Sequence, residues 1–219
     1  MGSIRRFDLD RIIREYKTHY FFETGTFLGE GIEYALRSPF KKIASVEIIP
    51  EIAGKAKDRF SALQNVEIIE NDSVNALATK VPAMKSNCIF WLDAHFPGAD
   101  AGMKGYDDNM YDALRLPLIN EIEIIHRLRK NFQDVLIIDD LRIYEDGPYE
   151  NGNVPGDALP VTDRNINFIY KYFSASHVIL KCYLDEGYIL IFPKFKYRKR
   201  VLLNKIFLRK RDKEDFYFV

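Results

Sequence analysis

Short apolar segments alternate with amphipathic segments along most of the chain. The apolar segments are rich in β-branched and aromatic residues and are bounded by turn residues, which predicts buried strands. We expect strands at 19–23, 42–48, 66–69, 88–92, 135–138, 178–183 and 188–192. Apolar residues at helical spacing predict helices at 8–17, 32–36, 50–63, 111–130 and 166–173.

This order of elements predicts an α/β fold, a doubly wound and mostly parallel seven-stranded sheet with helices on both faces. Residues 184–187 join the last two strands into a C-terminal antiparallel hairpin, which we expect to place one antiparallel strand at the edge of the sheet. Two long loops, 96–109 and 143–165, follow strands that end in carboxylates. Ligands of open α/β sheets bind at the carboxyl ends of the strands, so the residues directly after each strand are the candidates for chemistry.

Length and composition fit one domain, 1–193, followed by a short tail, 194–219. The chain has 219 residues, of which 47% are hydrophobic and 29% charged, and this composition excludes a mostly disordered chain. Cys88 and Cys182 both lie in apolar segments, which argues against a disulfide scaffold and favours the cytoplasm. We find no apolar run near the roughly 20 residues of a membrane span and no apolar signal-peptide core at the N-terminus.

The net charge is zero, but it is unevenly distributed. Residues 194–219 contain 10 Lys and Arg against 3 Asp and Glu, whereas residues 1–193 contain 22 against 29. The basic, amphipathic tail has three open interpretations: packing on its own domain or on a second subunit of a homo-oligomer, peripheral contact with an anionic membrane at its inner face, or RNA binding. The acidic body makes nucleic acid the least favoured partner.

A glycine-rich loop follows the first predicted strand, with the sequence Glu23-Thr-Gly25-Thr26-Phe-Leu-Gly29-Glu-Gly31. Its spacing fits neither a dinucleotide fingerprint nor a phosphate-binding P-loop. The acidic Glu23 would repel phosphate and would suit a ligand with a positively charged amino-acid portion. A plain turn between strand and helix is the alternative interpretation of this loop.

Acidic residues also follow the next two strands. Glu47 lies 24 residues beyond Glu23, where a carboxylate can accept both hydroxyls of a ribose. Asp72, followed by Ser73, could receive an adenine amino group or could cap a helix.

Taken in order, Glu23-x-Gly25, Glu47 and Asp72 on successive strands resemble class I S-adenosylmethionine-dependent methyltransferases, over about residues 15–193. The resemblance implies a Rossmann-like methyltransferase domain over 1–193. It also implies that S-adenosylmethionine is the cofactor. The cofactor-binding residues that we predict are Glu23, Gly25, Thr26, Gly29, Glu47, Asp72 and Ser73.

Three carboxylates follow the fourth and fifth strands, namely Asp93, Asp139 and Asp140. Neighbouring parallel strands would bring them together, and their mutual repulsion would raise their pKa values. A hard divalent cation such as Mg²⁺, Ca²⁺ or Mn²⁺ would relieve that repulsion. Helix capping or pairing with Arg142 is the alternative explanation.

These carboxylates resemble those of metal-dependent O-methyltransferases of the macrocin type and, more distantly, of the catechol type. The resemblance implies that Asp93, Asp139 and Asp140 hold a metal that lowers the pKa of an acceptor hydroxyl. The chain departs from both types, since it reads Asp93-Ala-His95-Phe96. The macrocin type often has Asp-x-Asp-Leu-Tyr here. The catechol type has a Lys three places after the Asp, where this chain has Phe96. We therefore predict His95, with Asp93, as catalytic. The unperturbed pKa of a histidine, near 6.5, suits a general base. Metal ligation and a structural role stay open for His95. Lys104 is the second candidate for the base.

The sequence thus predicts a metal-dependent O-methyltransferase that acts on a hydroxyl of a sugar, glycan or similar polyhydroxylated metabolite. The polar and aromatic residues of the two long loops suit such an acceptor: Asp100, Lys104, Tyr106, Asp107, Asp108, Arg142, Tyr144 and Tyr149. The alternatives are an RNA methyltransferase recruited by the tail and a non-catalytic nucleotide-binding scaffold.

Overall fold

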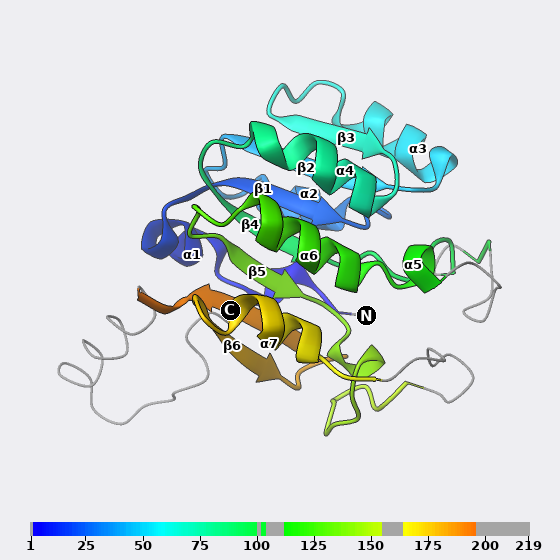
Figure 1. Ribbon diagram of the computed structural model, residues 1–219. Coiled ribbons are helices and arrows are strands. Elements are labelled where there is room, and N and C mark those ends of the chain that lie inside the picture. The colour runs from blue at the N-terminus through cyan, green and yellow to red at the C-terminus, as the bar shows by residue number, and fades with distance from the viewer. Residues whose placement is uncertain (1, 100–101, 104–111, 155–163, 196–219) are drawn as a thin grey trace.

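A single sheet organises the part of the chain that the computed structural model describes, which is residues 2–99, 102–103, 112–154 and 164–195. Seven strands follow the order β3-β2-β1-β4-β5-β7-β6 (Figure 1). Their bounds are Thr18–Thr24 (β1), Lys42–Glu47 (β2), Val66–Glu70 (β3), Asn87–Leu92 (β4), Val135–Ile138 (β5), His177–Cys182 (β6) and Tyr188–Pro193 (β7). The predicted α/β fold with a seven-stranded, mostly parallel sheet is confirmed.

The C-terminal hairpin differs from the prediction in one respect. Strand β7 is antiparallel to both of its neighbours, but it lies between β5 and β6 rather than at the edge. The edge strand β6 consequently runs in the same direction as β5. Burial explains the order, because all six residues of β7 are buried whereas most of β6 is only partly buried. The more apolar strand takes the inner position.

The helices agree with most of the predicted segments. Their bounds are Leu9–Tyr16 (α1), Glu30–Ala35 (α2), Pro50–Phe60 (α3), Ser73–Lys80 (α4), Asp112–Arg115 (α5), Leu118–Leu128 (α6) and Asn167–Phe173 (α7), with short 3₁₀ helices at Ile4–Arg6 (η1), Val81–Ala83 (η2) and Leu141–Ile143 (η3). The side chain of Asp8 caps α1 and that of Asp72 caps α4. Helix α4 was not among the predicted helices.

The single long helix predicted over 111–130 is wrong. The structure has α5 and α6 in that region, with Pro117 at the start of α6. A proline has no backbone N–H and disfavours helical geometry in the residue before it, so the helix is interrupted at 116–117. Beside the break, the carbonyl of Arg115 accepts a hydrogen bond from the N–H of Phe96 at 2.9 Å, which ties α5 to the loop after β4.

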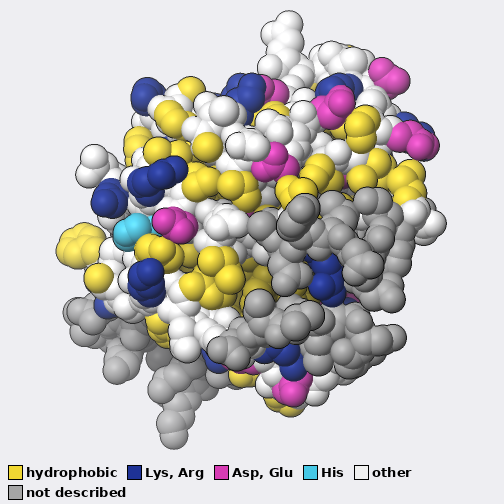
Figure 2. Space-filling view, turned by 45° about the vertical axis from the view of Figure 1, so that its right-hand side comes forward, with side chains coloured by type: hydrophobic (Ala, Val, Ile, Leu, Met, Phe, Trp, Pro, Cys, Tyr) yellow, Lys and Arg dark blue, Asp and Glu magenta, His cyan; other side chains and the backbone are white. Residues whose placement is uncertain are grey.

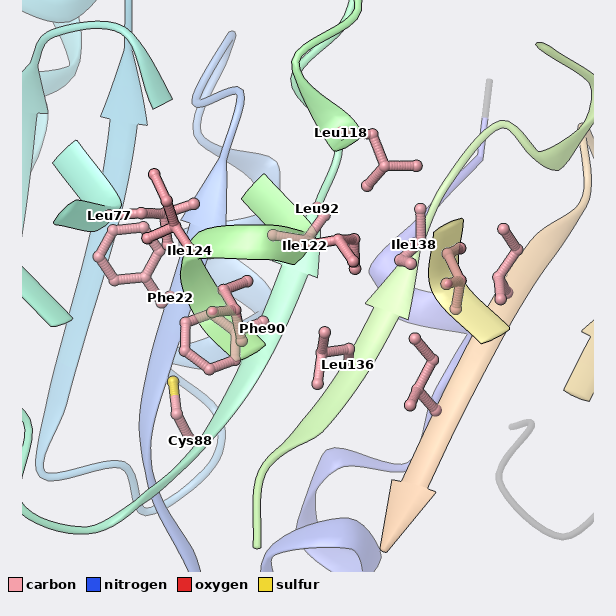
Figure 3. Packing of buried hydrophobic residues seen from close by; sticks show 14 of the residues in the cluster. Phe22, Leu77, Cys88, Phe90, Leu92, Leu118, Ile122, Ile124, Leu136 and Ile138 are labelled. Atoms are coloured by element: carbon pink, nitrogen blue, oxygen red, sulfur yellow. The ribbon is translucent and has the colours of Figure 1, made fainter. Parts of the chain in front are cut away.

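Two apolar layers cover the two faces of the sheet, as a doubly wound fold requires. Helices α4, α6 and α7 pack on one face, where residues such as Phe22, Phe90 and Leu136 form the core (Figures 1 and 3). Helices α1, α2 and α3 pack on the other, against residues such as Phe21 and Ile89. Because strand side chains alternate, neighbours such as Phe21 and Phe22 serve opposite layers.

Several predictions fall on residues that are not described. Residues 196–219 of the tail and the loop residues Asp100, Lys104, Tyr106, Asp107 and Asp108 lie outside the described residues, so their predicted roles and the boundary of the domain stay predictions. Among the helices that are described, none is long and apolar enough to cross a membrane.

Candidate functional site

The carboxyl ends of the parallel strands surround a cavity of about 150 Å³. It is lined by the loop after β1, by the residues that follow β2 and β3, and by residues 93–98 after β4. Of the predicted cofactor-binding residues, these line the cavity: Glu23, Gly25, Thr26, Glu47, Asp72 and Ser73. Gly29 does not line it. The structure therefore brings together predicted residues as far apart in the sequence as Glu23 and Ser73.

The glycine loop lies tightly against the strand ends. The N–H groups of Gly25 and Thr26 both donate to the carbonyl of Val46, at 3.0 Å. Gly25 has φ = +88°, and a Cβ atom on it would lie 2.7 Å from the carbonyl oxygen of Asp93. Gly29 faces the ring of Phe60 instead, at the start of α2. Gly25 thus allows the close approach of the loop to β4, whereas Gly29 serves packing.

We expect Gly25→Ala to lower the free energy of unfolding by about 1–2 kcal/mol, because an L side chain is strained at positive φ. The variant should also bind S-adenosylhomocysteine more weakly, because the added side chain shifts the loop. Chemical denaturation and titration calorimetry measure the two effects. Gly54→Ala is the matched control, since Gly54 lies within α3 with open space around it. It should stabilise the protein by about 0.5–1 kcal/mol and leave binding unchanged. Equal behaviour of the two variants would contradict the role given to Gly25.

Glu23 is buried beneath this loop. The hydroxyl of Ser45 donates to its Oε2 atom at 2.5 Å, and Ser45 in turn lies 2.7 Å from Oγ1 of Thr26. A Cβ atom on Gly31 would overlap Oε1 of Glu23, so any larger residue at that position would displace this carboxyl group. Burial raises the pKa of Glu23 to about 8, with Asp93 and Glu47 adding to the shift. Glu23 is therefore mostly uncharged at neutral pH, which differs from the anionic role that the sequence suggested.

Glu47 ends β2 and is held by the backbone on both sides. Its Oε2 atom accepts the N–H of Phe27 at 3.0 Å, and its Oε1 atom accepts the N–H of Ile49 at 2.9 Å. The carboxylate is buried, lines the cavity and keeps further lone pairs for a ligand. This arrangement is suited to two neighbouring hydroxyl groups.

Asp72 and Ser73 begin α4. Oδ1 of Asp72 accepts the N–H of Asn75 at 2.8 Å, so the capping alternative from the sequence is confirmed. Asp72 lines the cavity as well, and its adenine-binding role stays a prediction. The hydroxyl of Ser73 binds the carboxylate of Glu121 on α6.

His95 lies at the centre of the predicted metal-binding carboxylates. Its Nε2 atom is 2.8 Å from Oδ2 of Asp140, and its Nδ1 atom is 3.5 Å from Oδ1 of Asp93. Nε of Arg142 is 2.9 Å from the other oxygen of Asp140. Asp139 is buried, and its Oδ1 atom accepts the N–H of Asp140 at 2.8 Å. The carboxylates thus gather around a histidine and an arginine.

This donor set does not fit a divalent cation in the observed arrangement. Both oxygens of Asp140 already face cationic or hydrogen-bonding groups. Within the described ranges, no three His, Cys, Asp or Glu side chains form a cluster that could hold a metal ion. The pairing of Asp140 with Arg142, which was the alternative explanation, is observed.

The ionisation of the cluster follows from these contacts. Burial alone would lower the pKa of His95, but Asp140, Asp93 and Asp139 outweigh burial and raise it to about 10. Burial and the neighbouring carboxylates raise the pKa of Asp139, whereas His95 and Arg142 overcome burial and lower the pKa of Asp140. A protonated His95 with both ring nitrogens facing carboxylates is a hydrogen-bond donor, so this arrangement does not favour its predicted role as a general base.

The N-terminal segment closes one side of the site, a contribution that the sequence analysis missed. Residues 2–4 line the cavity, and a Cβ atom on Gly2 would overlap the carboxylate of Asp139. Arg6 anchors the segment through Nε, 3.0 Å from Oδ2 of Asp185. No local pattern in residues 2–6 could have indicated these two contacts, because Asp139 and Asp185 lie more than 130 positions further along the chain.

The residues predicted to bind the acceptor are only partly available. Tyr149 is buried and donates its hydroxyl to the carbonyl of Glu145, so it does not face the cavity. Arg142 is engaged with Asp140, and Tyr144 lines a second, smaller cavity. Two exposed apolar side chains, Leu28 and Leu114, lie at the rim of the main cavity. Hydrophobic side chains also reach the surface across the middle of the face drawn in Figure 2.

Comparison with known proteins supports the fold. No protein-family model and no curated protein matches the sequence. An O-methyltransferase from Bacillus cereus, solved in complex with S-adenosylhomocysteine, is similar with a TM-score of 0.54 and 14% identity, over 88% of this chain and 82% of that chain.

Two further solved structures are similar. A predicted O-methyltransferase from Klebsiella pneumoniae has a TM-score of 0.53 and 14% identity, over 88% of this chain and 81% of that chain. A predicted caffeoyl-CoA O-methyltransferase from Staphylococcus aureus has a TM-score of 0.52 and 15% identity, over 84% and 80%. The chain has the Rossmann-like fold of these proteins.

Proposed function

We propose that this protein is an S-adenosylmethionine-dependent O-methyltransferase. The observation that carries the proposal is the set of groups around the main cavity: a glycine loop after β1, a backbone-held carboxylate at the end of β2 and a capping aspartate after β3. The resemblance to class I methyltransferases assigns these groups, in this order along the sheet edge, to the amino-acid tail, the ribose and the adenine of the cofactor. The shared fold with O-methyltransferases supports the same proposal.

The residues of the cavity would each have a distinct task. Glu47 would accept the two ribose hydroxyls, and Asp72 would lie near the adenine. The close approach of Gly25 to β4 would direct the reactive end of the ligand toward residues 93–95. S-adenosylmethionine, when bound, supplies an electrophilic methyl group, so the chain's main contribution would be to orient the attacking oxygen and exclude water.

The acceptor that we propose is a hydroxyl of a sugar, glycan or similar polyhydroxylated metabolite. Polar groups beside the cavity, the partly buried His95 and the buried Glu121 in particular, support an acceptor with several hydrogen-bonding groups. Contact of the tail with an anionic membrane, formation of a homo-oligomer and recruitment of RNA concern mainly residues outside the described ranges and stay predictions.

Metal dependence stays a separate prediction. It rests on Asp93, Asp139 and Asp140, whose observed arrangement does not fit a divalent cation, and no step of the proposed reaction depends on it. Methyl transfer assayed in excess EDTA decides the question. The ion pairs of Asp140 with His95 and Arg142 favour activity that persists in the chelator, whereas complete loss that Mg²⁺ restores would support the metal site.

Titration calorimetry of S-adenosylmethionine and S-adenosylhomocysteine, with and without Mg²⁺, tests the proposed function. We expect micromolar binding of either compound, since the cavity offers matched groups to each part of the nucleoside. Assays of methyl transfer to hydroxylated acceptors would follow. The absence of binding under every condition would contradict the proposal, and binding without any turnover would favour the non-catalytic scaffold.

A further inference from the structure

A second, smaller cavity lies beside the main one, between the ends of β4 and β5 and helix α6. It shares Ala94 and His95 with the main cavity, so it lies directly next to the proposed cofactor site. Its volume of about 10 Å³ is close to that of one water-sized group. Besides its apolar walls it is lined by the polar side chains of His95, Asp139, Tyr144 and Glu121.

Glu121 is the unusual member of this set. Its side chain is fixed on one side, because the hydroxyls of Ser73 and Thr24 bind the carboxylate. Thr24 also accepts the N–H of Asp93 at 3.3 Å, which ties Glu121 to the ends of β1 and β4. Only 1% of Glu121 is exposed, yet its Oε1 atom has no hydrogen-bond partner among the described residues.

An unpaired oxygen of this kind is costly. A buried polar atom without a partner destabilises a protein by about 1–3 kcal/mol, and more where it is charged. His95, the cationic neighbour in the cavity, already faces Asp140 and Asp93 with its two ring nitrogens. Glu121 thus lines a space of about one oxygen atom and has one carboxyl oxygen that no described residue supplies with a hydrogen bond.

We propose that Glu121 binds the methyl acceptor: its Oε1 atom faces the position of the transferred methyl group and accepts a hydrogen bond from the hydroxyl that is methylated. The inference rests on the proposed function. It assigns the small cavity to the attacking oxygen, because the main cavity already contains the groups for the nucleoside and the two cavities meet at His95. The attacking group of the acceptor must then carry a hydrogen.

The charge of Glu121 can be used to test this placement without knowledge of the acceptor. Burial raises the pKa of Glu121 to about 7, against the hydrogen bonds of Ser73 and Thr24, so the carboxylate is mostly ionised at pH 8. Sinefungin is an analogue of the cofactor in which a carbon replaces the sulfur and carries an amine at the position of the transferred methyl group. S-adenosylhomocysteine keeps the sulfur and carries nothing at that position. A carboxylate that faces the methyl position should favour sinefungin over S-adenosylhomocysteine.

The experiment measures the dissociation constants of both compounds at pH 8 for the wild-type protein, Glu121→Gln and Glu123→Gln. We expect Glu121→Gln to lower the preference for sinefungin by about tenfold, because a nearby opposite charge is lost, and to change the affinity for S-adenosylhomocysteine less than about twofold. Glu123 is exposed on the same helix, so its variant is the matched control and should behave like the wild type. Glu121→Asp, which keeps the charge, should retain part of the preference.

The outcomes separate the inference from the proposed function. An unchanged preference in Glu121→Gln, with S-adenosylhomocysteine bound normally, would overturn the role of Glu121 and leave the methyltransferase proposal intact. Failure of the wild-type protein to bind either compound would overturn the proposed function and the inference with it. If thermal denaturation shows that Glu121→Gln unfolds, Glu121→Asp decides instead. A reduced preference for sinefungin in that variant supports the inference, and a preference equal to that of the wild type contradicts it.

Discussion

Glu47→Ala is expected to weaken the binding of S-adenosylhomocysteine by about 100-fold. Two effects add up: the ribose loses its charged acceptor, and the loop after β1 loses the hydrogen bond from the N–H of Phe27 to the carboxylate. A hydrogen bond to a charged group contributes about 1.5–3 kcal/mol, and 2.8 kcal/mol corresponds to roughly 100-fold in a dissociation constant. Titration calorimetry measures the change directly.

Glu70→Ala is the matched control for this prediction. Glu70 lies opposite Glu47 in the parallel register of β2 and β3, but it is exposed and pairs with Lys57 on the surface. We expect its variant to bind S-adenosylhomocysteine as the wild type does. Wild-type affinity in Glu47→Ala would show that the end of β2 does not hold the ribose.

Among the proposed variants, Arg129→Met is expected to lose the most stability. The free energy of unfolding should fall by about 3–5 kcal/mol, because the substitution leaves a buried carboxylate without its cation. Arg129 follows α6 and forms a two-pronged pair with Asp134, in which Nε and Nη2 lie 2.8 Å from the two oxygens. Both residues are at most 4% exposed. The guanidinium also donates to the carbonyls of Met84 and Ser86, so it joins the end of α6 to the segment before β4.

Chemical denaturation measures this loss, and the melting temperature should fall by about 10 °C. Arg127→Met provides the control, since Arg127 is exposed on the same helix and its replacement should change the free energy of unfolding by less than about 0.5 kcal/mol. A loss below about 1 kcal/mol in Arg129→Met would mean that the pair behaves like a surface ion pair.

The sequence alone was enough to predict the alternating order of strands and helices. Apolar segments such as 88–92 and 135–138 are strands because local composition and periodicity report burial on a sheet. The positions directly after the strands were predictable for the same reason, and Gly25, Glu47, Asp72 and Asp93 all line the cavity that they form. The break at Pro117 was equally local, since proline itself interrupts a helix, but the longer apolar repeat masked it.

Other features depend on contacts between distant parts of the chain, and only the tertiary structure decided them. The inner position of β7 depends on which strand buries more apolar surface. The raised pKa of Glu23 follows from its burial under the glycine loop, and the pairing of Asp140 with His95 and Arg142 follows from how the loops after β4 and β5 meet.

Glu121 illustrates the difference most clearly. In the sequence it is one acidic residue of an amphipathic helix, like the exposed Glu123 two positions later. Its chemistry arises because α6 packs near the ends of β1 and β4, where Thr24 and Ser73 bind the carboxylate, Oε1 keeps no partner among the described residues and the residue lines a small cavity. Periodicity determined which segments form the sheet and its helices, whereas burial and charge at their junctions, which no local pattern encodes, determined the state of each group in the site.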